Sequence, residues 1–480
     1  MIEDRFQELC KVFDRILKKA PTPEIIANNY LHIFNLDSES LAKYDASKIK
    51  NFWLSIKFRL VAIIRLFHSI YDKNYYFGRQ QNVRSDILFV SHITNSEQLL
   101  QDNDAYFGFM PDKLLKKKVN SSIALIMHNK INNKKVLNRF VDRDIPRFLL
   151  SSSLDFLSEI KLYLSQRKSK KQLRSNLKDF QVDNKLAKDI LRYHLSPSTI
   201  QANRIAIQVA RIVNETESKF LITTYEGHPW ERLVYYYARK INPNIKCFGY
   251  QHAAVFKYQH AIKRPLGKEY DPDVVLTSGL IAKDILNKSP MRDYKIVCIG
   301  SPKHPPNAIM TNKKKTCLVV PEGLISECLI LFKLSLTYAK RHQDQKFIWR
   351  LHPLVSFENL KKHNDIYNHL PNNIHLSNDG LDEDIKKCDS VLYRGSTAVV
   401  KAINAGLKPI YYQQNAHELC VDSIYQHKRG KEIVNNQKEL NLALNKNIDM
   451  KTKQVLQVFA QDFYTPLDTE ILISEIKDQN

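Results

Sequence analysis

The chain has 480 residues, of which 43% are hydrophobic and 26% are charged, so it is long enough for two or three domains with sizeable cores. Its 12 glycines exclude a collagen-like or low-complexity protein. The 73 Lys and Arg residues outnumber the 50 Asp and Glu residues, which gives a formal net charge of +23. Such an excess favours phosphate-rich partners: nucleic acid, an anionic membrane surface or a nucleotide-activated substrate.

Cysteine usage and the N-terminal stretch indicate the compartment. The seven cysteines are scattered and form no CxxC pair, so neither a disulfide framework nor a zinc site is predicted. Residues 1–20 mix acidic and basic side chains and lack the apolar core of a signal peptide, and no window offers the long uncharged span of a transmembrane helix. We therefore expect a cytoplasmic protein, or one held peripherally at the inner face of the cytoplasmic membrane.

Residues 1–80 are expected to form a helical N-terminal extension. Between Asn51 and Ile70 apolar residues recur at helical spacing on one face, and basic residues lie on the other side. Two interpretations follow: the apolar face packs on the domain behind it, or the helix lies at a membrane surface. The apolar positions are Phe52, Trp53, Ile56, Leu60, Ile63, Ile64, Phe67 and Ile70.

Residues 81–302 are expected to form a first Rossmann-like domain. Short apolar runs alternate there with helical stretches, which predicts a parallel sheet covered by helices. The basic segment 161–178 is expected to be an exposed hairpin or excursion. The predicted strands are 85–92, 121–127, 145–150, 219–224, 245–250, 273–277 and 294–300.

Residues 316–450 are expected to form a second Rossmann-like domain. A linker at 303–315 precedes it, because the prolines and basic run there continue neither a helix nor a sheet readily. A C-terminal helix is expected within 451–480, over about 452–476. Two doubly wound α/β domains in tandem predict a cleft between the carboxyl ends of both sheets, the architecture called GT-B. The predicted strands are 316–320, 346–351, 374–377, 390–393 and 409–412.

The stretch KFIWRLHP, residues 346–353, predicts a buried strand that ends at a histidine. Pro353 cannot donate to a sheet and restricts His352 to extended geometry. Ligands bind at the carboxyl ends of strands in open α/β sheets, so His352 is a candidate phosphate contact. Arg350 has the same parity as His352 and is a candidate substrate contact. The alternative is a histidine that only closes a loop.

Two further segments of the second domain are candidate nucleotide-binding loops. In YRGSTAV, residues 393–399, a glycine follows a strand, and Ser396 and Thr397 suit a helix start, where backbone N–H groups bind anions. Arg394 could add a charge-assisted bond to a phosphate. In VPEG, residues 320–323, a loop could approach the nucleotide. The predicted contacts are Arg394, Gly395, Ser396, Thr397, Glu322 and Gly323. Helix capping alone is the alternative for the serine.

Two strand ends of the first domain carry candidate acid–base groups. Glu226 follows the predicted strand 219–224, where a carboxylate can accept a proton from an attacking hydroxyl. His228 is an auxiliary donor candidate, and His252, in GYQHA, could bind a substrate oxygen. Glu231 and Arg232 are expected to form a structural ion pair. The alternatives are a solvated Glu226 and a His252 that only packs.

Metal and common cofactor motifs are not predicted. The DxD spacings at 142–144 and 271–273 are short and frequent patterns, and neither suits a nucleotide-binding strand end. The chain has no P-loop, GxGxxG, HExxH or GxSxG motif, which argues against the common NTPase, dehydrogenase and hydrolase chemistries.

Together the motifs resemble those of bacterial sialyltransferases and polysialyltransferases of GT-B fold, which carry an acidic-Gly motif in the first domain and His-Pro and Ser/Thr motifs in the second. The segments GYQHA (249–253) and IGSP (299–302) also resemble bacterial capsule and lipopolysaccharide transferases, including those that transfer Kdo. The resemblance covers roughly residues 219–412, and Tyr225 stands where the family often has a second acid. The three motifs are Glu226-Gly227, His352-Pro353 and Ser396-Thr397.

The resemblance implies a metal-independent glycosyltransferase without a cofactor. It would transfer a CMP-activated ulosonic acid, sialic-, pseudaminic-, legionaminic- or Kdo-like, to a bacterial surface glycan such as capsule, O-antigen or lipooligosaccharide. Residues 81–302 would bind the glycan or lipid-linked acceptor, and residues 316–450 the CMP-sugar. His352 and Ser396-Thr397 would stabilise the leaving phosphate, while Glu226 deprotonates the acceptor hydroxyl. Direct attack would invert the anomeric centre, and a retaining route through a carboxylate nucleophile stays open.

Other functions remain open at this stage. A GT-B transferase of cell-surface polysaccharide synthesis could use a UDP-sugar or CDP-glycerol as its donor. A basic nucleic-acid-binding protein is suggested by the charge alone, and because the usual aromatic-basic motifs are absent we expect no nucleic acid partner. The same charge makes an anionic membrane surface a further candidate partner, close to a lipid-linked acceptor.

Overall fold

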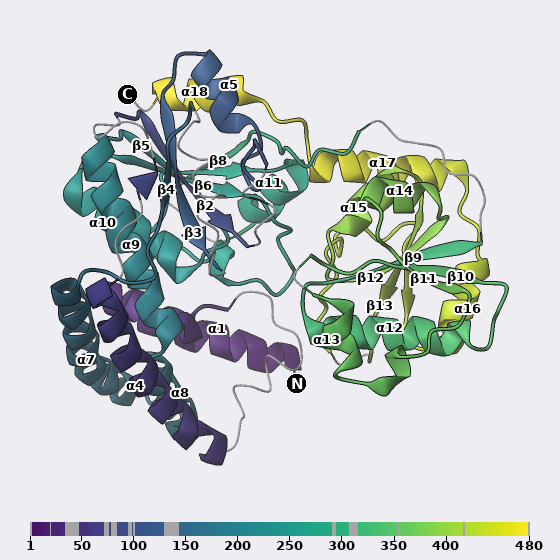
Figure 1. Cartoon of the computed structure of the whole chain (residues 1–480), viewed down its shortest axis with the longest axis horizontal. Coiled ribbons are helices and arrows are strands. Elements are labelled where there is room, and N and C mark those ends of the chain that lie inside the picture. The colour runs from purple at the N-terminus through teal and green to yellow at the C-terminus, as the bar shows by residue number, and fades with distance from the viewer. Residues whose placement is uncertain are drawn as a thin grey trace.

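The computed structural model contains two parallel-sheet domains that lie side by side (Figure 1). It describes residues 2–19, 21–33, 48–71, 76–77, 84–94, 98, 101–128, 144–289, 294–306, 315–353, 355–415 and 418–478. The predicted linker therefore lies largely outside the described residues, as does most of the DxD spacing at 142–144.

The sheet of the first domain has the order β1-β4-β3-β2-β5-β6-β7-β8. Its strands pair in parallel, except that β1 runs antiparallel to β4 at the edge. The central strands are buried on both faces, which explains their nearly continuous apolar sequences. The strands are β1 (Tyr76–Phe77), β2 (Ile87–Ile93), β3 (Ser121–Met127), β4 (Arg147–Leu149), β5 (Phe220–Thr224), β6 (Lys246–Gln251), β7 (Val274–Thr277) and β8 (Lys295–Cys298).

Helices cover both faces of this sheet, and the N-terminal segment adds to one of them. Side chains of α1 and α2 belong to the same buried core as α9, α10 and one face of the sheet. The helices are α1 (Ile2–Lys19), α2 (Pro23–Ile26), α4 (Lys48–Tyr71), α5 (Met110–Lys116), α7 (Phe156–Asp179), α8 (Asn184–Tyr193), α9 (Pro197–Thr216), α10 (Pro229–Ile241) and α11 (Leu280–Asn287), with 3-10 turns η1 (Asn29–Leu31) and η4 (Ala261–Lys263).

The second domain is a smaller sheet of the order β11-β10-β9-β12-β13-β14, and each of its pairings is parallel. Its strands are β9 (Thr316–Pro321), β10 (Lys346–Trp349), β11 (Ile374–Leu376), β12 (Ser390–Arg394), β13 (Lys408–Tyr412) and β14 (Glu432–Val434). Its helices are α12 (Ile325–Ala339), α13 (Phe357–Lys361), α14 (Leu381–Lys386), α15 (Ala398–Asn404), α16 (Gln437–Asn445) and α17 (Met450–Phe463), with the 3-10 turn η5 (Asp365–Tyr367).

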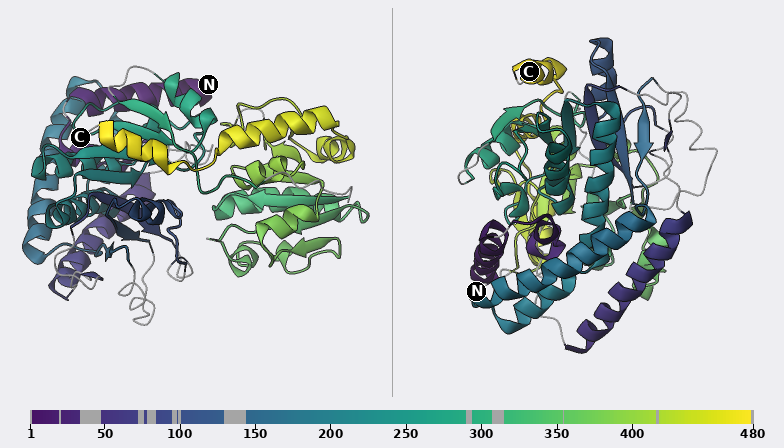
Figure 2. Two further views of the ribbon diagram at one scale, coloured as in Figure 1. Left: turned by 90° about the horizontal axis from the view of Figure 1, so that it is seen from above. Right: turned by 90° about the vertical axis from the view of Figure 1, so that its left-hand side faces the viewer.

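The C-terminus crosses back to the first domain (Figure 2, left). The single helix predicted over 452–476 is two helices, α17 and α18 (Thr469–Asp478), because Pro466 lies between them. Leu472 and Ile476 of α18 join the core of the first domain. The crossing segment pairs with the chain after β8: the N–H of Ser301 donates to Thr465 O at 2.9 Å. Two chain segments therefore connect the domains.

Segment 161–178 is not the hairpin or excursion that its charge predicts. It belongs to the continuous helix α7. Lys, Arg, Gln and Leu are good helix formers, and the segment contains neither Gly nor Pro. Buried residues recur along α7 at helical spacing, so one face packs while the basic face meets solvent: Leu162, Gln166, Ser169, Leu173 and Leu177.

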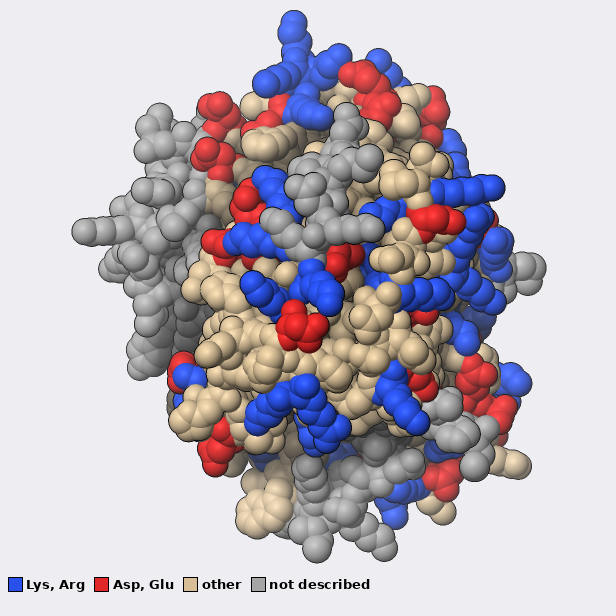
Figure 3. Space-filling view, turned by 90° about the vertical axis from the view of Figure 1, so that its right-hand side faces the viewer, with Lys and Arg blue, Asp and Glu red and all other residues tan. Residues whose placement is uncertain are grey.

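The expected fold class is confirmed: two Rossmann-like α/β domains in the GT-B arrangement, with helices before the first sheet. No helix within the described residues is long and apolar enough to cross a membrane. Figure 3 shows the face of the second domain, where Lys and Arg side chains have Asp and Glu side chains among them. The positive charge on this face is thus interrupted by acidic groups.

Candidate active site

Four neighbouring strands of the first domain bring titratable side chains to one edge of the sheet. β3, β2, β5 and β6 lie in this order, and their carboxyl ends lead to His128, His92, Glu226 and His252 respectively. Parallel strands end at the same edge, so residues far apart in sequence meet there. Nδ1 of His92 lies 3.0 Å from Nε2 of His128, and Nε2 of His92 lies 3.0 Å from Oγ1 of Thr224.

Glu226 lies at the centre of this group. Its Oε2 is 3.2 Å from Nε2 of His228, and its Oε1 is 3.8 Å from Nε2 of His252. Burial alone would raise the pKa of Glu226, but the hydrogen bond from His228 and the charges of His252, His228 and His92 outweigh it and hold the pKa at about 2. The structure therefore brings Glu226, His228 and His252 together as predicted, with Glu226 ionised at neutral pH.

The pKa values of the two histidines beside Glu226 are shifted in opposite directions. Burial lowers the pKa of His252 to about 4, although the charge of Glu226 acts against this. Burial also acts to lower the pKa of His228, but the hydrogen bond to Glu226 and the charges of Glu231 and Glu226 raise it overall. At neutral pH the site thus combines a carboxylate, a neutral His252 and a His228 that holds its proton more strongly than usual.

Glu231 shapes the loop that carries Glu226. Its carboxylate accepts the backbone N–H groups of Glu226, Gly227 and His228, the last two at 2.8 and 2.7 Å. Gly227 has φ +84°, and its backbone packs against the carbonyl of Ala261, which leaves no room for a side chain. The predicted ion pair between Glu231 and Arg232 is absent, because Arg232 pairs with Asp271 instead.

Several residues of the site were missed at the level of sequence. His92, His128 and Tyr106 lie beside the predicted group: the Tyr106 ring stacks edge-on against His252 with centroids 4.9 Å apart. Burial lowers the pKa of His92 well below its usual value, with the charge of His128 as the next cause. The signal available in the sequence was that SDILFVSH ends a predicted strand with a histidine, like GYQH.

Three neighbouring strands of the second domain form the opposite wall. β10, β9 and β12 lie side by side, and their carboxyl ends lead to His352, Gly323 and Gly395. A Cβ on Gly323 would lie 2.8 Å from Nδ1 of His352, so the two loops touch at that point. Gly395 has φ +73°, and a Cβ there would meet the carboxylate of Glu322. The predicted His-Pro, Glu-Gly and Gly-Ser-Thr segments therefore converge.

The geometry of the Ser396-Thr397 segment favours local donors over a helix dipole. α15 begins at Ala398 and has only seven residues, and Ser396 Oγ accepts the N–H of Ala398 at 3.4 Å. A short helix contributes little macrodipole, so anion binding here would rest on hydroxyl and backbone N–H groups. Burial lowers the pKa of His352, which makes its ring a neutral donor at pH 7 in the absence of ligand.

The two arginines predicted near the nucleotide are paired inside the second domain. Arg394 is 2% exposed, and its guanidinium binds Glu418 at 2.7 Å and Glu327 at 2.5 Å. Its charge is neutralised by the network that joins β12 to α12, so its phosphate contact stays a prediction that these ion pairs disfavour. Arg350, a predicted substrate contact, pairs with Asp384 at 2.9 Å. It holds the start of α14 to the end of β10.

The two walls meet at the crossing segments. A cavity of about 370 Å³ is lined by Lys303 and Pro353 together with the loop after β2. Tyr464 lies in the crossing segment: its backbone carbonyl is 2.6 Å from Nδ1 of His304, and burial raises the pKa of its phenol to about 12. Tyr464 and Lys303 were not predicted from the sequence. The remaining lining residues are Gln98, Gln101, Asn103, Asp104, Ala105, Gly108 and Pro302.

Among the described residues, no group of three or more His, Cys, Asp or Glu side chains has the geometry to hold a metal ion. The two aspartates of the 271–273 spacing stabilise the backbone by accepting its N–H groups. Asp271 accepts the N–H groups of Leu266 and Gly267, and Asp273 accepts the N–H of Cys247 at 2.7 Å.

No family model matches the chain, and no curated protein is similar to it in sequence. Solved structures resemble it weakly. The glycosyltransferase SnogD from Streptomyces nogalater has 10% identity over 82% of this chain and 100% of its own, with a TM-score of 0.47. MurG from Acinetobacter baumannii has 11% identity over 82% of this chain and 99% of its own, with a TM-score of 0.45. A UDP-GlcNAc 2-epimerase from Methanocaldococcus jannaschii has 10% identity over 78% of this chain and 99% of its own, with a TM-score of 0.43.

Proposed function

We propose that the chain is a glycosyltransferase that moves a sugar from a nucleotide-activated donor to a glycan acceptor. The observation that carries this proposal is the pairing of two walls: Glu226 between His228 and His252 on one side, and the converging loops of His352, Gly323 and Gly395 on the other. The first wall can accept a proton, and the second offers donors to a phosphate.

The proposed reaction is a displacement at the anomeric carbon. The acceptor hydroxyl attacks that carbon while its proton passes to Glu226, and the bond to the nucleotide phosphate breaks. His352 and the hydroxyls of Ser396 and Thr397 donate to the phosphate as its charge grows, an effect that fixed donors commonly supply at several kcal/mol. A single displacement inverts the anomeric centre.

The donor that we propose is a CMP-activated ulosonic acid. Support comes from the three motifs named above and from the paired arginines: with Arg394 and Arg350 bound to carboxylates, the loops of the second wall offer an imidazole, hydroxyls and backbone N–H groups. Such a set suits the single phosphate of a CMP-sugar, which departs without a diphosphate to neutralise.

A UDP-sugar is the second candidate donor, and one observation favours it. Lys303 lies in the cavity between the walls, where it could neutralise a second phosphate. Burial lowers the pKa of Lys303, while the charge of Glu226 acts against this. UDP-GlcNAc and UDP are named as ligands of the Methanocaldococcus jannaschii epimerase.

The acceptor is proposed to enter through the cavity. Amide side chains line it, and amides recognise sugar hydroxyls by paired donor and acceptor groups. A surface glycan, free or lipid-linked, has the matching chemistry. The amides concerned are those of Gln98, Gln101 and Asn103.

Turnover of matched donors tests the proposal. The full chain is incubated with CMP-ulosonic acids or UDP-sugars and a mixture of bacterial glycan acceptors, and release of CMP or UDP is followed. Acceptor-dependent CMP release supports the CMP donor, and acceptor-dependent UDP release supports the alternative. Release of neither nucleotide from any donor, with no thermal stabilisation by CMP or UDP, would refute the glycosyltransferase assignment.

A further inference from the structure

Helix α4 presents an apolar row to solvent. Six large hydrophobic side chains are between 51% and 66% exposed, and at 100° per residue they fall within an arc of about 120°. This row includes most of the positions that sequence analysis placed on the apolar face. More than half of each of these side chains is exposed, which favours the membrane-surface interpretation over packing on the domain behind the helix. They are Trp53, Leu60, Ile63, Ile64, Phe67 and Ile70.

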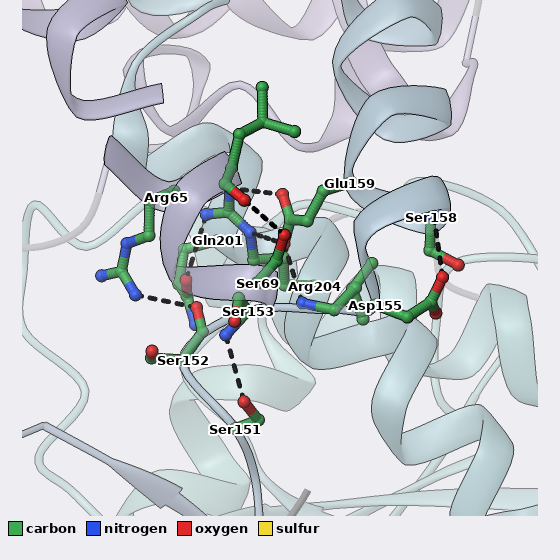
Figure 4. A network of polar contacts seen from close by, with 12 residues as sticks. Arg65, Ser69, Ser151, Ser152, Ser153, Asp155, Ser158, Glu159, Gln201 and Arg204 are labelled. Atoms are coloured by element: carbon green, nitrogen blue, oxygen red, sulfur yellow. Dashed lines mark hydrogen bonds and ion pairs between the residues drawn. The ribbon is translucent and has the colours of Figure 1, made fainter. Parts of the chain in front are cut away.

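The opposite side of α4 fixes the helix to the protein (Figure 4). Nη1 of Arg65 donates to the carbonyl of Ser152 at 2.9 Å, and Ser69 is buried. The Phe58 ring packs on Tyr193 of α8 with centroids 5.9 Å apart. These side chains lie on the face opposite the apolar row, so the row is turned away from the protein by specific contacts.

The segment that receives α4 is itself held firmly. Glu159 of α7 and Arg204 of α9 form a buried two-bond pair, with N–O distances of 2.6 and 2.8 Å. Glu159 also accepts the N–H of Leu154 at 2.8 Å, which ties the loop after β4 to α7 (Figure 4). This network gives α4 a rigid base, and the exposure of the row does not arise from a loose helix end.

Basic side chains border the apolar row. Lys57 and Arg59 are exposed and lie at its two edges on α4. Burial lowers the pKa of Lys170 on α7, and the next causes are the charges of Arg174, Arg59, Arg192 and Arg167. α4 packs against α7 (Figure 2, right), and Arg167 and Arg174 of α7 are exposed, so two neighbouring helices carry exposed basic residues.

We propose that this α4 surface, formed by the six apolar side chains and the basic residues Lys57, Arg59, Arg167, Lys170 and Arg174, binds an anionic lipid bilayer. The helix lies in the plane of the membrane with the row in the boundary between headgroups and acyl chains, and the cations contact lipid phosphates. Charge complementarity favours a bilayer over a second copy, because a copy would bring like charges together at the edges of the row.

The surface acts apart from the active site, and it would hold the enzyme where lipid-linked acceptors are made. The test is sedimentation of the full chain with phosphatidylcholine vesicles or with vesicles that contain about 30% phosphatidylglycerol, at about 50 mM and about 500 mM salt. We expect binding to the anionic vesicles only, and weaker binding at the higher salt concentration.

Two paired variants identify the surface. Trp53→Ser/Phe67→Ser should weaken binding about tenfold or more, since membrane affinity scales with buried apolar area. Leu442→Ser/Val458→Ser, which changes exposed apolar residues of the second domain, should bind like the original chain. Circular dichroism and thermal unfolding check that both variants fold.

Three results would overturn the proposal. The first is unchanged vesicle binding by a folded Trp53→Ser/Phe67→Ser variant, and the second is an equal loss of binding in the control variant. The third is that the original chain does not bind vesicles but forms a dimer, which the Trp53→Ser/Phe67→Ser substitutions dissociate. Nucleotide release from a soluble acceptor should be the same in both variants, so a failure of the membrane proposal is separable from a failure of the proposed reaction.

Discussion

The carboxylate of Glu226 and the imidazole of His228 lie 3.2 Å apart, and each changes how the other titrates. The pKa of Glu226 is about 2 while the pKa of His228 is raised. A carboxylate with so low a pKa is a weak base. Loss of the proton from His228 removes one of the interactions that lower the pKa of Glu226, so Glu226 becomes a stronger base as pH rises.

The first prediction is a rate that increases with pH. For the original chain, kcat should rise as pH passes through the pKa of His228, above its usual value of 6.5. In His228→Gln this rise should disappear, because no imidazolium is present. Steady-state rates between about pH 5.5 and 9 measure both profiles. A rate that falls with pH in the original chain would instead make protonated His228 the proton donor.

A second prediction concerns the contact between Gly323 and His352. Gly323→Ala places a Cβ 2.8 Å from the imidazole and must displace it, so the KM for the donor should rise about tenfold or more. Gly380→Ala is the matched control, because it has φ −65° and nothing within 4 Å of the added Cβ. Equal donor KM values in the two variants would show that His352 does not contact the donor.

A third prediction concerns protonation of His352. Burial lowers its pKa, and a bound phosphate would raise it again, so nucleotide binding should take up a proton. The affinity for CMP should therefore increase from about pH 8 to about pH 6.5 more in the original chain than in His352→Gln. Titration calorimetry measures the CMP affinity of the original chain and of His352→Gln at each pH. The variant is the control for protonation of the CMP phosphate itself, which changes with pH in both proteins. Parallel pH dependences would place the phosphate elsewhere.

A fourth prediction tests the structural role of Arg394. Arg394→Gln leaves Glu327 and Glu418 buried without their partner, so the free energy of unfolding should fall by about 3–5 kcal/mol. Lys386→Gln removes an exposed pair with Glu383 and should cost under about 1 kcal/mol. Urea unfolding compares them. A loss as small as that of the control would return Arg394 to the phosphate site.

Much of the fold follows from sequence pattern, because parallel strands buried on both faces give short, continuous apolar runs. KFIWRLHP and SSIALIM both form strands close to their predicted bounds. The short strands β1 and β14 carry too few residues for a pattern, and α7 was obscured by its charge. Local sequence does not show which strands pair in the sheet, so the contacts of His92 with His128 and Thr224 could not be predicted.

The residues of the candidate site that follow strands could be predicted from the sequence. The side chains that contact them could not. Glu226, His252 and His352 end strands, which is a local property. Arg394 also ends a strand, but its pairing with Glu418 depends on a contact 24 residues away. Tyr464 lies beside His304 because the chain crosses back after α17, and local sequence does not predict that crossing.

The most direct test of the account is acceptor-dependent nucleotide release by Glu226→Gln beside the original chain. We predict acceptor-dependent release of CMP or UDP by the original chain. In the variant, kcat should be lower by about 10²–10⁴ with donor KM nearly unchanged, because the proton acceptor is lost while the phosphate wall is intact. A Glu226→Gln variant that turns over at the original rate would contradict it.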